Sequence, residues 1–130
     1  MALDNIQLEF SNDFVGKMIS PTGTVLIGDQ PNGIQPYHLL FGALGSCFYS
    51  TFLAIATKKR LTFGSVKVEV SGQKRSGEVQ TLEWVNIKVS ITNPSNEALL
   101  TRSAELGTRF CSIHNTIAHV AEMHLEVLFI

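Results

Sequence analysis

The stretch LLFGALGSCFYSTFLAIA, residues 39–56, decides how this 130-residue chain is organised. It is the apolar part of a longer segment, residues 30–57, that carries no formal charge. Pro36 lies where a helix would begin, and its fixed φ suits the first helical turn. The cations at 58–60 suit the negative end of a helix dipole. We therefore predict a helix from Pro36 to about Thr57.

The predicted helix is long enough to raise the question of a membrane span. Polar and small residues interrupt it, among them Gly45, Ser46 and Thr51, and the half-buried strands elsewhere need a core to cover. We therefore favour a central helix that is packed on every side. A ridge of small side chains at i, i+4 spacing would let another helix approach closely; it consists of Gly42, Ser46, Ser50 and Ala54.

Four segments alternate apolar and polar residues, as strands with one buried face do. They lie at residues 5–10, 66–71, 85–91 and 124–129. The turn-rich stretch 72–77 should join the two middle segments into a long hairpin, and residues 23–28 are a further candidate strand.

Two more helices are predicted between these strands. One follows Asn93-Pro94, with Asn93 as the N-cap, and should end near Gly107. The other should start at Cys111 or Ser112, with an apolar side formed by Ile113, Ile117, Val120 and Ala121. The pattern predicts a single α+β domain over residues 1–130, with an antiparallel sheet wrapped around the buried central helix.

The composition of the chain indicates which classes of partner to expect. The chain is 45% hydrophobic and 16% charged, which is apolar for so small a domain and favours burial against a second copy. The net charge is −1 with no basic block, so we expect neither nucleic acid nor a membrane surface as a partner. The N-terminus has no basic region followed by an apolar run, so we expect a cytoplasmic protein without a signal peptide.

The two cysteines, Cys47 and Cys111, lie 64 positions apart and do not form a disulfide framework pattern. They could be inert core residues, metal ligands or redox groups. Cys111 lies at a predicted helix N-terminus, where positive potential favours the thiolate. Spacing alone leaves these alternatives open.

Three parts of the sequence resemble the osmotically inducible protein C / organic hydroperoxide resistance (OsmC/Ohr) family. Pro36 followed eleven residues later by Cys47 is similar to the helix of that family's first cysteine. The run Cys-Ser-Ile-His-Asn-Thr-Ile at 111–117 resembles the second-cysteine motif of one subgroup, and Val-x-Val-x-Val-Ser-Gly at 66–72 fits the family order. The resemblance covers essentially the whole chain.

The resemblance implies an intertwined homodimer that reduces organic hydroperoxides with its thiols. Cys47 would be the peroxidatic cysteine, which becomes a sulfenic acid, and Cys111 the resolving cysteine, which closes a disulfide on it. The active site would lie at the subunit junction. A dithiol reductant would restore the thiols, and neither a cofactor nor a metal ion is expected.

Two departures from the family pattern concern charge. The glutamate that active members carry nine residues before the first cysteine is replaced by His38, and no arginine precedes Arg60. Because a buried thiol needs a positive neighbour or hydrogen-bond donors to form a thiolate, we include a protonated His38 as a third candidate catalytic residue.

Two other functions remain open. A non-catalytic dimer could bind an apolar or acyl ligand in the groove beside the first helix, which would suit the missing glutamate and arginine. A thiolate–imidazole metal site could be built from Cys47, Cys111, His38 and His114.

Overall fold

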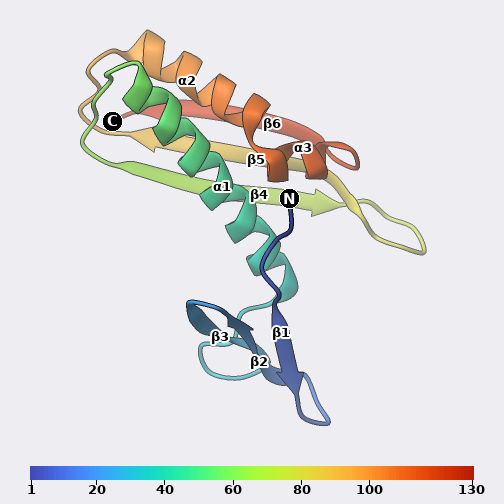
Figure 1. Ribbon diagram of the computed structural model, residues 1–130. Helices are drawn as coiled ribbons and strands as arrows, with labels where there is room; N and C mark the ends of the chain where they lie inside the picture. Colours follow the sequence, from blue (N-terminus) through green and yellow to red (C-terminus); the bar gives the residue numbers. More distant parts are fainter. The chain divides into compact units, whose positions relative to one another are not determined.

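A computed structural model describes all residues, Met1–Ile130, as six strands and three helices (Figure 1). In chain order they are β1 (Gln7–Phe10), β2 (Val15–Ser20), β3 (Gly23–Gly28), α1 (Pro36–Lys58), β4 (Val66–Lys74), β5 (Leu82–Ile91), α2 (Glu97–Phe110), α3 (Ser112–Ala118) and β6 (Glu122–Phe129). The α+β class predicted from the sequence is confirmed. The chain divides into two compact units, Met1–Leu40 and Phe41–Ile130.

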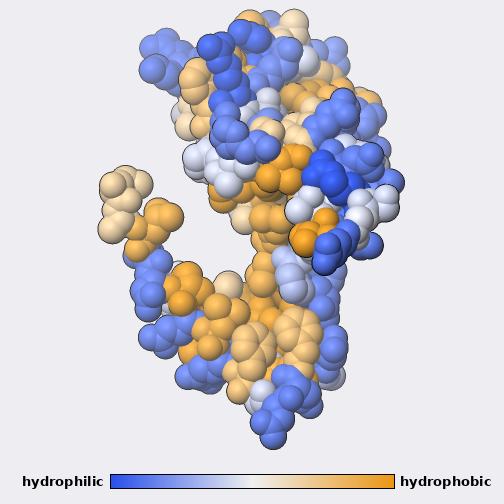
Figure 2. All heavy atoms as spheres, turned by 90° about the vertical axis from the view of Figure 1, so that its right-hand side faces the viewer, coloured by the Kyte–Doolittle hydropathy of each residue, from blue (hydrophilic) through white to orange (hydrophobic).

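The first unit is an antiparallel sheet in the order β1-β2-β3. Gly28 ends β3 at φ +93°, a conformation that glycine adopts without strain, and its Cα faces the carbonyl of Phe14. Ile27 is the one fully buried apolar side chain of this unit. Several others lie at the surface, where Figure 2 shows apolar side chains gathered in the lower part of the view. They are Ile6, Leu8, Phe10, Phe14 and Leu26.

The second unit contains a sheet in the order β4-β5-β6. The predicted hairpin of β4 and β5 is antiparallel, with Val66 opposite Ile91. β6 pairs with β5 in parallel, from Trp84 opposite Glu122 onward, so the sheet is mixed rather than purely antiparallel. A parallel pair requires a crossover connection, which α2 and α3 supply here.

The core of the second unit lies between its sheet and its helices (Figure 1). β5, the central strand, contributes alternate side chains that are completely buried: Val85, Ile87, Val89 and Ile91. α1 contributes one stripe at i, i+4 spacing: Leu44, Phe48, Phe52 and Ala56. Burial of these four side chains therefore holds one side of α1 against the core of the second unit.

Glycine allows α2 to approach α1 closely. A Cβ added at Gly107 would lie 3.1 Å from Cε1 of Phe48 and 3.3 Å from Cβ of Phe52, closer than most side chains tolerate. This contact fixes α2 beside the part of α1 that follows Cys47.

The expectation that α1 is packed on every side is wrong within this chain. Only one stripe of the helix is buried, and the predicted ridge of small residues, Gly42 to Ala54, is exposed. By length and composition α1 is the one helix that could cross a membrane, a weak sign because the core helix of a soluble protein passes the same test.

Three local predictions need correction. The N-cap of α2 is Asn96, whose Oδ1 accepts the N–H of Leu99 at 2.9 Å, while Asn93 occupies a left-handed turn at φ 47°. The helix continues past Gly107 to Phe110. Val120 is half-exposed beyond the end of α3, so it does not belong to that helix's apolar side. β2, which the sequence analysis missed, pairs with both β1 and β3.

Candidate active site

Both cysteines belong to the second unit, and a side-chain hydrogen bond between them is among the causes that shift the pKa of each thiol. Cys47 is half-buried on α1, and Cys111 is fully buried at the junction of α2 and α3. Both are free thiols. Two residues that are 64 positions apart in the sequence therefore form one site.

The first turn of α3 surrounds the sulfur of Cys47 with donors. Burial raises the pKa of the Cys47 thiol, but hydrogen bonds outweigh burial, and the net pKa lies below its ordinary value. The donors are the Cys111 thiol, the backbone N–H of Ile113, and the hydroxyl and N–H of Ser112. A thiolate that accepts several hydrogen bonds is stabilised relative to the neutral thiol.

Cys111 is affected in the opposite direction. Burial raises its pKa, and the hydrogen bond to Cys47 and the charge of the Cys47 thiolate raise it further. The N–H of His114, 3.4 Å from Cys111 Sγ, opposes these effects only in part. The proton therefore stays on Cys111 while Cys47 ionises first.

The sequence analysis expected a helix N-terminus to favour the thiolate of Cys111, although the resemblance made Cys47 the peroxidatic cysteine. Cys111 does precede a helix, as its N-cap, and its backbone leads into the first turn. However, it lies deeper than Cys47, and the N–H groups of Ser112 and Ile113 act on Cys47 across the helix–helix contact. Ser112 and Ile113 were not recognised as site residues, because their role depends on a contact between distant parts of the chain.

The imidazole of His114 is half-buried, and burial lowers its pKa, which favours the neutral ring. Its contribution to the site comes from its main chain, which donates to Cys111. His114 therefore does not supply a positive charge at neutral pH.

His38 lies in the first unit, at the start of α1. Its Nδ1 accepts the backbone N–H of Gln35 at 3.0 Å, which requires a free lone pair on that nitrogen. An imidazolium at His38 would have to give up this hydrogen bond. Its assignment as a catalytic residue stays a prediction.

The suggested metal site lacks its ligands. No group of three or more His, Cys, Asp or Glu side chains is arranged to hold a metal ion. The hydrogen-bonded pair of cysteines supplies two sulfur atoms and no third ligand of these types, so the geometry favours thiol chemistry over metal binding.

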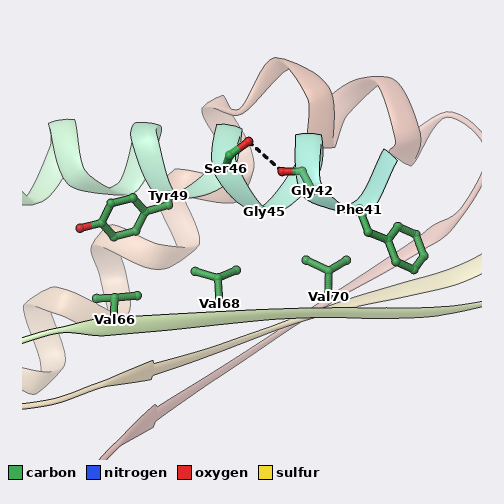
Figure 3. Close-up of a pocket in the computed structure, with 8 residues that line it drawn as sticks. All are labelled: Phe41, Gly42, Gly45, Ser46, Tyr49, Val66, Val68 and Val70. Carbon is green, nitrogen blue, oxygen red and sulfur yellow. Dashed lines mark hydrogen bonds between the residues drawn. The ribbon is translucent and has the colours of Figure 1, made fainter. Parts of the chain in front are cut away.

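A groove lies between α1 and β4 (Figure 3). Its volume is about 480 Å³. The three valines of β4 point toward the helix and form its floor, opposite Gly42, Gly45 and Ser46, with Phe41 and Tyr49 at its ends. Gly45 and Cys47 are about 200° apart around the helix, since each residue turns it by about 100°. Cys47 and Gly45, which lines the groove, therefore lie on different sides of α1.

A protein-family model matches the part of the chain that carries this site. The family described as OsmC-like protein matches residues 28–126, which include both cysteines and the whole of α1. The chain belongs to the OsmC-like protein family.

Several solved structures share this fold. An OsmC-like protein from Mycoplasma pneumoniae is 20% identical, with a TM-score of 0.87 over 99% of this chain and 98% of that one. A hypothetical protein from Aquifex aeolicus is 23% identical, with a TM-score of 0.85 over 100% and 99%. The organic hydroperoxide resistance protein OhrB of Bacillus subtilis is 14% identical, with a TM-score of 0.73 over 97% and 98%. At these identities the likeness establishes the fold alone. A search of curated protein sequences finds no match.

Family membership agrees with the resemblance seen in the sequence. The donors that lower the pKa of Cys47 lie within this OsmC-like chain. They come from a neutral thiol, a hydroxyl and backbone N–H groups rather than from a charged side chain.

Proposed function

We propose that this protein is a thiol-dependent peroxidase that reduces organic hydroperoxides. The observation that carries the proposal is the unequal pair of thiols: the pKa of Cys47 is lowered, and Cys47 accepts a hydrogen bond from Cys111, which keeps its proton. A peroxidatic cysteine must be a thiolate to attack an O–O bond, and a resolving cysteine must be close enough to condense with the product.

The proposed cycle has three steps. The Cys47 thiolate attacks the terminal oxygen of ROOH, the O–O bond breaks, and uptake of one proton gives ROH and a Cys47 sulfenic acid. The Cys111 thiol then displaces water from that sulfenic acid and forms the Cys47–Cys111 disulfide. A dithiol reductant finally exchanges with the disulfide, which restores both thiols and oxidises the reductant to its own disulfide.

Hydroperoxide titration tests this cycle. One equivalent of cumene hydroperoxide per chain should remove both free thiols from the wild type and release one equivalent of alcohol. Cys111→Ser should lose one thiol and accumulate a sulfenic acid that dimedone traps, and Cys47→Ser should lose none. Unchanged thiol counts in the wild type would refute peroxidase activity.

The working unit is proposed to be a homodimer. The ridge Gly42, Ser46, Ser50 and Ala54 is exposed along α1, and β1 exposes Leu8 and Phe10. Burial of such surfaces against a second copy would resemble an obligate dimer interface, which commonly exceeds about 2,000 Å² in total. A monomer by sedimentation at micromolar concentration would contradict it.

The groove beside α1 favours a second candidate function, binding of an apolar or acyl ligand without catalysis. Its valine floor and its volume of about 480 Å³ suit such a ligand. Titration calorimetry with a medium-chain fatty acid, on wild type and on Gly45→Leu, tests it. Binding lost in Gly45→Leu, together with no reaction at Cys47, would replace the peroxidase proposal.

A further inference from the structure

The side chain of Asn115 links the two ends of the turn that contains Cys111 by hydrogen bonds. The Nδ2 of Asn115 donates to the carbonyl of Arg109 at 2.9 Å and to the carbonyl of Cys111 at 2.8 Å. Arg109 lies in the last turn of α2, and Cys111 is both the C-cap of α2 and the N-cap of α3. The amide thus satisfies the Arg109 carbonyl at the end of α2, where carbonyl groups lack intrahelical donors, and shares the Cys111 carbonyl with the N–H of Asn115.

The turn needs this support because its backbone is not helical at Cys111. That residue is extended, with φ −76° and ψ 116°, between two helices. Its N–H donates to Gly107 O at 3.0 Å, and its carbonyl accepts the N–H of Asn115 at 3.0 Å. The hydrogen bond from the Cys111 N–H to Gly107 O holds the turn against the end of α2. The hydrogen bonds that the Asn115 side chain donates fix the direction in which α3 begins.

The direction of α3 determines the surroundings of Cys47. The groups that lower the pKa of Cys47 are the Cys111 thiol and the donors of Ser112 and Ile113, and all three residues lie on the tied turn or immediately after it. A small rotation of this turn would move all of these donors together. Hydrogen bonds weaken steeply with distance and misalignment.

We propose that Asn115 is a positioning residue of the two-cysteine site: by donating to the Arg109 and Cys111 carbonyls, its amide holds Cys111 and the first turn of α3 against Cys47. Asn115 acts through the main chain, since its amide bonds to carbonyl groups. This role of Asn115 depends on the proposed function in one respect only: Cys47 is taken to be the reactive thiol.

The test compares two Asn115 variants with a control on the same helix. Asn115→Asp keeps the size and one oxygen of the side chain but cannot donate, and Asn115→Ala removes the group. Thr116→Val is the matched control, because it removes the neighbouring bond from Thr116 Oγ1 to Ser112 O at 3.0 Å. The reduced full-length proteins are alkylated with iodoacetamide between pH 5 and 10, and the rate at Cys47 is followed by peptide mass spectrometry.

Both Asn115 variants should move the midpoint of the Cys47 profile upward by about one pH unit, which corresponds to about tenfold less thiolate below the midpoint. Thr116→Val should follow the wild type within about twofold. Profiles of the Asn115 variants that superimpose on the wild type would overturn the proposal. An equal shift in Thr116→Val, or loss of the circular dichroism spectrum in both Asn115 variants, would also overturn it in favour of a purely structural role.

The alkylation assay contains no hydroperoxide. If Cys47 fails to react with hydroperoxides, the proposed function falls while the alkylation profiles still decide the role of Asn115. If the profiles do not shift, the role of Asn115 falls and the peroxidase cycle is unaffected.

Discussion

The thiol of Cys111 donates a hydrogen bond to the sulfur of Cys47, although the two residues come from different helical segments. The bond makes the pair unequal: the pKa of Cys47 is lowered and that of Cys111 is raised. A nucleophile with a protonated neighbour is the arrangement that a two-cysteine peroxidase requires before it meets its substrate.

Removing the Cys111 donor should make Cys47 a weaker acid. In Cys111→Ala we expect the Cys47 pKa to rise by one to two units, because a hydrogen bond to a charged group contributes about 1.5–3 kcal/mol. Cys111→Ser keeps a donor and should show a smaller rise. Thiolate absorbance at 240 nm during a pH titration measures both, and equal values in Cys111→Ala and wild type would exclude the hydrogen bond as a cause.

The peroxide reaction should follow the ionisation of Cys47. Since its pKa is lowered, the rate of sulfenic acid formation should rise with pH and reach its plateau below the ordinary thiol range near about 8.5. The rate should fall as pH decreases through the lowered pKa, because the thiolate is protonated. Stopped-flow mixing with cumene hydroperoxide measures the profile, and a rate still rising steeply above pH 9 would contradict it.

A protonated His38 is a second proposed source of thiolate stabilisation. If its imidazolium activates Cys47, His38→Ala should lower the rate of sulfenic acid formation by about 10²-fold, the scale of a positioned acid–base group. Changing His38 to Glu should not help, since no arginine precedes Arg60. Equal rates for wild type and His38→Ala between pH 5 and 9 would exclude this role. The hydrogen-bond donors of α3 and Cys111 would then be the remaining source of thiolate stabilisation.

The contact at Gly107 should be important for stability. Gly107→Leu would force atoms into Phe48 and Phe52, where even a Cβ has neighbours at 3.1 and 3.3 Å. We expect a loss of about 3 kcal/mol in the free energy of unfolding, at the upper end of the usual range for overpacking. Urea denaturation measures it. Glu105→Leu, at an exposed position of the same helix, should change stability by less than about 0.5 kcal/mol.

Gly42 offers a test of dimerisation that does not disturb the protomer. A Cβ there has no neighbour within 4 Å in this chain, so an added side chain starts in open space on the exposed ridge. Gly42→Leu should therefore weaken the proposed dimer by at least tenfold, while Gly42→Ala should have a smaller effect. Sedimentation velocity over a concentration series measures the dissociation. An unchanged dimer in Gly42→Leu would exclude the small-residue ridge from the interface.

The sequence by itself predicted the elements whose signals are local. Alternating valines identified β4, a long uncharged run with Pro36 at its start identified α1, and Cys111 was recognised at the beginning of α3. These signals depend on side chains a few residues apart, which is why they can be read from one chain. The sequence missed β2, and it misplaced the N-cap of α2, because Asn93 and Asn96 are equally suitable by residue type and only the backbone path distinguishes them.

The tertiary structure alone decided how the chemistry is distributed. The sequence nominated both cysteines, and the resemblance made Cys47 the peroxidatic one, but the only local signal for a thiolate lay at Cys111, at the start of its own helix. In the fold Cys111 is completely buried, and the donors of the first turn of α3 act on Cys47 instead. Burial and hydrogen bonding depend on which segments meet in space, so the acidity of a thiol is determined by contacts that a local pattern does not contain.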